Sequence, residues 1–231
     1  MEFEYDKPYS YSKYNEFNRF QNIDSVEGLI VNHLVKSHTK HAELFWKLLK
    51  YNDINALSQP NVSEDERLAL VCNDNGEQTS KRVFFAPFVD DAWTEQCSSV
   101  YIFVENIYPI DHTRAAIGVT IESITHSKIS AIAGDGDPIL NPNANPNDSD
   151  IEGNIVVSFK NRATVLLKCI LAEINGLYLN GVGYLQLNNQ DMFHGKVEMP
   201  LWNSRSFYGH STSFFMVMGN VSETPDVEES Y

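Results

Sequence analysis

The feature that most constrains this fold is an amphipathic helix that ends at an Asn-Gly pair. A second Asn-Gly pair follows the helix in the sequence. From Arg162 onward, apolar residues recur at steps of three and four, and the pattern stops at Asn175-Gly176. The pair Asn180-Gly181 leads into a short strand over residues 184–187, and an aromatic strand follows over residues 212–218. This order predicts one helix docked on a small sheet. The segment carries no catalytic motif.

A second long helix is predicted nearer the start of the chain. Asp24 or Ser25 is a suitable N-cap, and a face of apolar and histidine side chains continues to about Tyr51. The residues on this face are Ile30, Leu34, His38, His41, Phe45, Leu48 and Leu49. Further along, Ser63-Glu64-Asp65-Glu66 is a capping box that opens a short third helix.

Strands are predicted between and after these helices. Residues 99–108 and 117–122 both alternate in strand fashion, and the turn Pro109-Ile110-Asp111-His112 between them indicates a hairpin. Shorter strands are expected at residues 83–88, 155–159 and 196–202. The predicted fold class is therefore α+β, with a mixed β-sheet covered by two long helices.

The sequence predicts one domain with three appendages. A single α+β domain over residues 25–220 follows an aromatic N-terminal arm over residues 1–24. Residues 133–154 form a long loop of Gly, Pro, Asn and acidic residues, and residues 221–231 form an acidic C-terminal tail. The rings of the arm either lie on a neighbouring subunit or pack on their own domain, and the pattern leaves both readings open.

The net charge of −14 is unevenly placed along the chain. Five of the acids, Asp135, Asp137, Asp148, Asp150 and Glu152, fall between Lys128 and Lys160, where there is no basic residue. The tail adds four more acids, so the rest of the chain is closer to neutral. This balance argues against a DNA-gripping surface, which needs clustered Lys and Arg. No apolar run is long enough to span a membrane, and the acidic start is not typical of a secretory signal.

Residues that could carry chemistry do not form complete sites. Three scattered cysteines, Cys72, Cys97 and Cys169, are expected to be free thiols. The histidines His33, His38 and His41 lack the i, i+4 spacing of a helical metal site, so packing or hydrogen-bonding roles are expected. Residues 148–153 match the first half of a calcium loop, but Phe159 stands where its last ligand would be. No metal, cofactor or enzymatic activity is therefore expected.

The second half of the chain resembles the neck proteins of contractile-tailed bacteriophages, which are tail terminators and head–tail connectors. The resemblance rests on the helix from Arg162 to Gly176, on the strand after Asn180-Gly181, and on Phe207-Tyr208-Gly209-His210 leading into the last strand. Residues 100–108 look like the strand that precedes this helix in the family. The sequence departs at His210, where an aromatic is expected, and in the length of the loop over residues 133–154.

The resemblance implies a structural protein of the virion neck, made in the bacterial host cytoplasm, that forms a hexameric or twelvefold ring at the head–tail interface. Its partners would be copies of itself and the portal, neck, tail-tube or sheath proteins, with DNA passing through the ring without sequence-specific binding. We expect partner contacts at Tyr5, Tyr9, Tyr11, Tyr14, Phe17, Trp202 and Tyr208. The five acids of the loop would face the channel, where they repel DNA phosphates, or would contact a neighbouring ring.

Other functions remain open on the sequence alone. A tail-completion, baseplate or tube-associated structural protein would fit the same features. A small enzyme would need a pocket with converging polar groups and a strongly perturbed ionisable residue. An adaptor for a host protein would be a monomer or dimer with one exposed apolar patch.

Overall fold

The protein combines a mainly antiparallel sheet with α-helices, as the α+β prediction states. The computed structural model describes residues 23–72, 80–86, 96–109, 114–133, 139–140, 155–156, 159–179, 182–187, 198–202 and 206–219. Within these ranges there are four α-helices. They are α1 (Val26–Lys36), α2 (Lys40–Lys50), α3 (Glu64–Leu70) and α5 (Arg162–Ile174).

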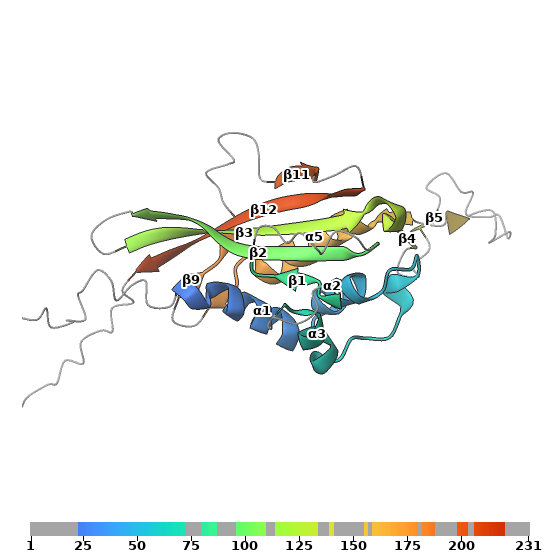
Figure 1. Cartoon of the computed structure of the whole chain (residues 1–231), viewed down its shortest axis with the longest axis horizontal. Coiled ribbons are helices and arrows are strands. Elements are labelled where there is room, and N and C mark those ends of the chain that lie inside the picture. The colour runs from blue at the N-terminus through green and yellow to red at the C-terminus, as the bar shows by residue number, and fades with distance from the viewer. Residues whose placement is uncertain are drawn as a thin grey trace, which may run out of the picture.

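Three long strands form the centre of the main sheet (Figure 1). β2 (Ser98–Pro109) and β3 (Arg114–His126) are the predicted hairpin, and β12 (Phe207–Gly219) pairs with β3 along its whole length. β1 (Val83–Phe84) adds to β2 in parallel. β10 (Gln186–Leu187) and β11 (Glu198–Trp202) both pair antiparallel with the other edge of β12.

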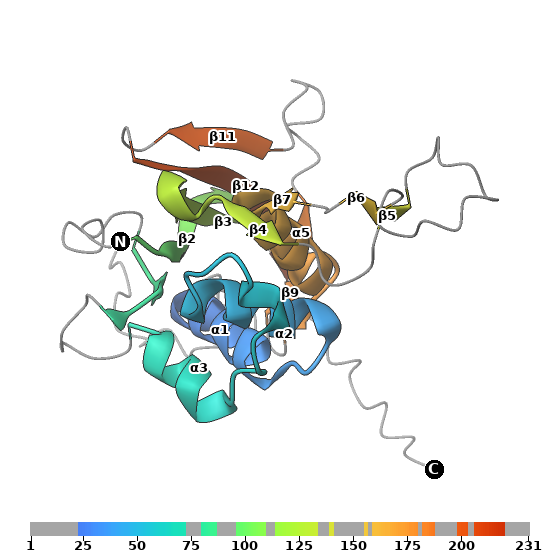
Figure 2. The same cartoon turned by 90° about the vertical axis from the view of Figure 1, so that its right-hand side faces the viewer.

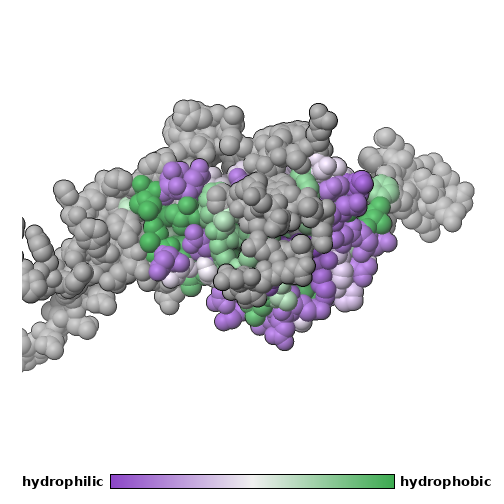
Figure 3. All heavy atoms as spheres, in the orientation of Figure 1, coloured by the Kyte–Doolittle hydropathy of each residue, from purple (hydrophilic) through white to green (hydrophobic). Residues whose placement is uncertain are grey.

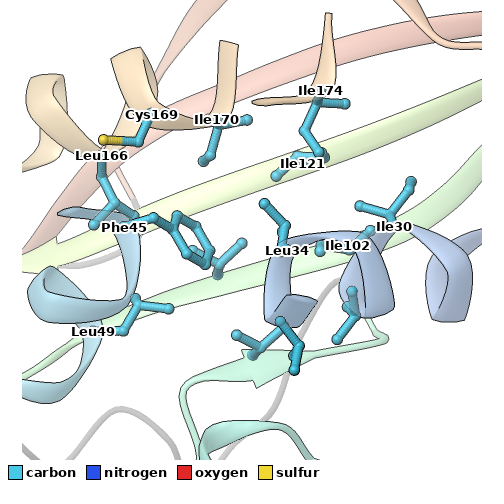
Figure 4. Close-up of a cluster of buried hydrophobic side chains, with 14 of the residues drawn as sticks. Ile30, Leu34, Phe45, Leu49, Ile102, Ile121, Leu166, Cys169, Ile170 and Ile174 are labelled. Atoms are coloured by element: carbon cyan, nitrogen blue, oxygen red, sulfur yellow. The ribbon is translucent and has the colours of Figure 1, made fainter. Parts of the chain in front are cut away.

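The strands alternate between two faces, and the helices cover one of them. Ile102 pairs with Ile121, and Phe214 pairs with Val119; all four side chains are buried in the main core. Seen along the strands, the helices gather on one side of the sheet (Figure 2). Figure 4 shows side chains of three helices converging over the sheet, namely Ile30, Leu34, Phe45, Leu49, Leu166 and Ile170.

The prediction of one continuous helix from residue 25 to about 51 is wrong. The chain leaves helical geometry at Ser37, whose ψ is 129°, and starts α2 after Thr39. The Thr39 hydroxyl accepts a hydrogen bond from the Ala42 amide at 3.1 Å, so it caps the new helix. Ser and Thr offer the backbone this alternative to a continuous ladder, while the apolar residues on either side stay on the core face. The sheet is therefore not covered by two long helices.

The predicted start of α3 and end of α5 are confirmed. Ser63 and Glu66 form both bonds of the capping box at the start of α3. α5 begins after Asn161, which caps it by accepting from the Thr164 amide at 3.3 Å. The helix ends at Asn175, and Gly176 takes a φ of +84°, which favours glycine and stops the helix.

The shorter strands differ in extent from the prediction. The strand expected over 184–187 is interrupted at the buried Leu185, whose backbone bonds to the segment after α5 instead. Three small two-stranded sheets complete the described part. They pair β4 (Ala131–Ala133) with β7 (Phe159–Asn161), β5 (Ile139–Leu140) with β6 (Ile155–Val156), and β8 (Tyr178–Leu179) with β9 (Gly183–Tyr184). β5 lies inside the loop that was expected to be wholly irregular.

Candidate interaction surfaces

Two buried arginines donate hydrogen bonds to carbonyl groups at the C-terminal ends of α1 and α2. Arg67 donates to the carbonyls of Val35 and Ser37, at 2.8 and 2.7 Å, and pairs with Glu43. Arg162 donates to the carbonyls of Leu48 and Tyr51, at 2.9 and 2.7 Å. The last carbonyls of a helix have no partner within it, so each guanidinium supplies the missing donors at a partly negative helix end. Both arginine side chains therefore stabilise the fold, and we do not assign them to a ligand-binding site.

Burial lowers the pKa of the Arg162 guanidinium to about 10, so it stays charged at neutral pH. The sequence marks Arg162 only as the first residue of a helix, and its burial was not predicted. An arginine at the first position of a helix, next to an Asn cap, gives no sign in the local sequence that its side chain contacts another helix.

Glu173 joins α5 to the break between α1 and α2. Its carboxylate accepts from the Ser37 hydroxyl at 2.9 Å and from the Thr39 hydroxyl, and it lies 3.5 Å from His33 Nε2. His38 Nε2 lies 3.0 Å from a carboxylate oxygen of Glu64. The predicted hydrogen-bonding role is therefore confirmed for His38, and His33 lies beside a carboxylate.

The sheet face opposite the helices carries a polar row. Glu122 accepts from the Ser211 hydroxyl at 3.5 Å, and Thr120 donates to Glu105, the extra residue where the β2–β3 register shifts. Burial raises the pKa of Glu122, the Ser211 bond lowers it, and the nearby Glu105 charge raises it further. The groups of this polar row therefore hydrogen-bond across strands, while burial and the nearby Glu105 charge disfavour the charged form of Glu122.

Glu122→Gln is expected to stabilise the protein at neutral pH. The folded state holds the Glu122 proton more tightly than the unfolded chain does, because its folded pKa is raised. Stability from this group is therefore complete below the unfolded pKa and is lost as pH rises through the folded pKa. Glutamine keeps an acceptor for Ser211 without the charge. Urea unfolding of both proteins should show a gain at pH 7 that shrinks towards pH 4; an equal gain at both would contradict this reading.

Exposed apolar and aromatic side chains gather, on both faces of the sheet, at the end where β2 and β12 finish and β3 begins. We call these side chains the strand-end patch; they are Ile107, Tyr178, Tyr184 and Val217, which are 49%, 50%, 59% and 41% exposed. Ile107 lies on the face of Met216, with which it shares the partner Ile117, and Val217 points to the opposite face. The two tyrosine rings contact each other with centroids 4.8 Å apart. Apolar surface, coloured green, gathers at this end of the molecule at the left of Figure 3.

The opposite end of the sheet also exposes apolar side chains. Phe159 is 64% exposed and Ile54 is 47% exposed. Both lie beside Ala133, which pairs with Phe159 and donates its amide to the Ile54 carbonyl at 2.8 Å. The molecule therefore presents two separate apolar surfaces, one at each end of its long strands.

A pocket of about 350 Å³ opens between α2 and α5 at this second end. Its buried or half-buried wall is apolar and consists of Leu44, Leu57, Val165 and Cys169. Its other residues are polar or basic, and they are half-buried (His41 and Lys160) or exposed (Asn161, Thr164 and Lys168). The N-terminus of α5 adds partial positive charge at Asn161. We call this site the basic-rimmed pocket.

The basic-rimmed pocket is suited to binding and offers little for catalysis. Burial raises the pKa of the Cys169 thiol to about 12, so the thiol stays protonated at neutral pH and is a poor nucleophile. Among the described residues, no group of three or more His, Cys, Asp or Glu side chains could hold a metal ion. Lysine and histidine beside an apolar wall suit an anionic ligand with an apolar part.

The predicted partner-contact residues lie only partly within the described ranges. Tyr208 is half-buried, and its hydroxyl donates to the Asn161 side chain at 3.2 Å, which places it next to the basic-rimmed pocket. Trp202 is the last residue of β11. The arm residues Tyr5, Tyr9, Tyr11, Tyr14 and Phe17 and the loop acids Asp135, Asp137, Asp148, Asp150 and Glu152 lie outside the described residues. All of these roles stay predictions.

All three cysteines are thiols outside any disulfide bond, as expected. Within the described ranges, none of the helices is long and apolar enough to cross a membrane. The sequence did not point to the strand-end patch or to the basic-rimmed pocket, because each combines residues from segments far apart in the chain. No protein family, curated protein or solved structure matches this chain.

Proposed function

We propose that this chain is a structural subunit that assembles head to tail into a ring, as in the neck of a contractile-tailed bacteriophage. The observation that carries the proposal is the pair of exposed apolar surfaces at opposite ends of the long strands. A heterologous contact joins two different surfaces of identical subunits, and repeating it closes a ring when the rotation allows. The family resemblance of the sequence adds the neck as the place of assembly.

The strand-end patch has the composition of an interface anchor. Tyr178 and Tyr184 bring large amphipathic rings, and Tyr is enriched among residues that dominate binding energy. Val217 supplies aliphatic surface close to β9, and Ile107 supplies it on the other face of the same end of the sheet. An adaptor for a host protein would need one such patch, whereas the second apolar surface at Phe159 and Ile54 favours a subunit with two neighbours.

The distribution of charge supports passage of DNA through such a ring. The described ranges contain 12 Lys and Arg and 11 Asp and Glu residues, so the acidic excess lies outside them. Part of that excess is the loop over residues 133–154. Acidic segments lining a channel would repel phosphates and let the duplex slide without being held. This step rests on the proposed ring.

Removing the strand-end patch is expected to weaken assembly. Ile107→Ser combined with Tyr178→Ser removes two exposed apolar side chains, and we expect the concentration for half-assembly to rise about tenfold or more. Sedimentation velocity measures the assembly, alone and with portal and tail-tube proteins, and electron microscopy identifies rings.

Leu68→Ser is the matched control for this experiment. Leu68 is 46% exposed on α3, close to the 49% of Ile107, but it lies outside both apolar surfaces. It should assemble like the unaltered protein. Equal assembly of the double variant and the control would contradict the role of the strand-end patch.

A further inference from the structure

The basic-rimmed pocket and the C-terminal tail belong to opposite ends of the sheet. Asn161 at the pocket accepts from the hydroxyl of Tyr208, the second residue of β12. The tail follows Gly219, the last residue of the same strand. At about 3.3 Å per residue, the strand places Tyr208 and Gly219 about 36 Å apart.

The tail carries charge of the opposite sign to the pocket. Residues 221–231 contain Glu223, Asp226, Glu228 and Glu229 without any basic residue, and Val227 lies among the acids. The pocket presents His41, Lys160 and Lys168 around an apolar wall. An acidic peptide with an interspersed apolar side chain therefore matches the pocket in both charge and polarity.

A tail cannot readily place its acids in the pocket of its own molecule. Glu229 follows Gly219 by ten residues, which span at most about 36 Å when fully extended. Even a straight path back along the sheet would just bring Glu229 level with Tyr208, and Glu223 and Asp226 would fall well short. A neighbouring copy that docks its strand-end patch here brings its own β12 end, and hence its tail, to the pocket.

We propose that the basic-rimmed pocket binds the acidic C-terminal tail, residues 221–231, of a neighbouring copy of this chain. The proposal rests on head-to-tail assembly and names one contact that makes it directional. The apolar surfaces supply the contact area between subunits. The tail in the pocket determines which end of one subunit binds which end of the next.

A charge-reversal exchange tests this contact in the full-length chain. One variant carries His41→Glu and Lys168→Glu, and the other carries Glu228→Lys and Glu229→Lys. Each alone places like charges in contact, so self-assembly should weaken at least about tenfold. In an equimolar mixture, every contact between the two variants pairs opposite charges, and assembly should return. Sedimentation velocity of the separate and mixed samples measures this.

The control carries Lys36→Glu, at an exposed lysine of α1 that does not line the pocket. It should assemble normally. If the unaltered chain assembles and the pocket and tail variants do so equally well, the pocket proposal fails while the proposed function stands. If replacing Asp148, Asp150 and Glu152 by amides abolishes assembly while the tail variant does not, the loop is the occupant and the proposal is overturned.

A binding measurement keeps the test decisive even if the chain alone does not assemble. A fluorescent peptide of residues 220–231 is titrated with the full chain and followed by anisotropy. The unaltered chain should bind it in a salt-sensitive way, and the variant with His41→Glu and Lys168→Glu should bind at least about tenfold more weakly. Absence of binding, or equal binding to both, would overturn the proposal independently of ring formation.

Discussion

Gly209→Ala is expected to prevent stable folding, because there is no room for a methyl group between β12 and β3. A Cβ at Gly209 would lie 1.7 Å from the Ser123 carbonyl oxygen and 2.8 Å from the Ile124 Cα. Both atoms belong to the backbone of the paired strand, so no side chain can rotate away. The two central strands of the sheet would have to separate near the start of β12, and we expect a loss of more than about 3 kcal/mol.

Gly28→Ala provides the matched control with the opposite sign. Gly28 lies in α1, and a Cβ added there would have nothing within 4 Å, so alanine should stabilise the helix by about 0.5–1 kcal/mol. Urea unfolding followed by circular dichroism measures both variants. If Gly209→Ala unfolds at the same urea concentration as the unaltered protein, the close approach of β12 and β3 is wrong.

Arg162→Met should produce the second large loss of stability. The guanidinium is fully buried and donates to the carbonyls of Ile129 and Asp53, at 2.9 and 2.8 Å, besides the two carbonyls at the end of α2. Methionine keeps much of the apolar stem but leaves these oxygens without their donor. Each buried polar group that loses its partner costs about 1–3 kcal/mol, so a total of more than about 3 kcal/mol is expected.

Lys36→Met, on α1, is the control for this substitution. Lys36 is exposed, and its replacement should change the free energy of unfolding by less than about 0.5 kcal/mol. Hydrogen exchange should also show faster exchange of the last amides of α2 in the Arg162 variant. If Arg162→Met lowers the free energy of unfolding by less than about 1 kcal/mol, the C-terminal end of α2 does not depend on the hydrogen bonds from this arginine.

The elements that the sequence predicted well are those defined by local chemistry. The hairpin of β2 and β3, the capping box at Ser63 and the end of α5 at Gly176 each depend on residues close together in the chain. The break between α1 and α2 was missed because its stabilising partner, Glu173, lies more than 130 residues away. Periodicity detects the buried face but not a polar contact from a distant helix.

The candidate surfaces were beyond the sequence for a similar reason. The pairing of β2, β3 and β12 brings Ile107 and Val217 of the strand-end patch to the same end of the sheet, on opposite faces. Its tyrosines lie in two-residue strands, which are too short for alternation to indicate which side chains are exposed. The basic-rimmed pocket joins His41 of α2 to Lys168 of α5, and no spacing marks that pair. The near-neutral charge of the domain, in contrast, could be predicted from the positions of the acidic residues alone.

The central claim is that this chain assembles through two different surfaces, and the mass of the particle it forms tests that claim most directly. Native mass spectrometry of the full chain, alone and with portal and tail-tube proteins, should show a closed oligomer of one defined size, with six or twelve copies. A chain of 26.2 kDa that remains monomeric at every concentration and in every mixture would contradict the account.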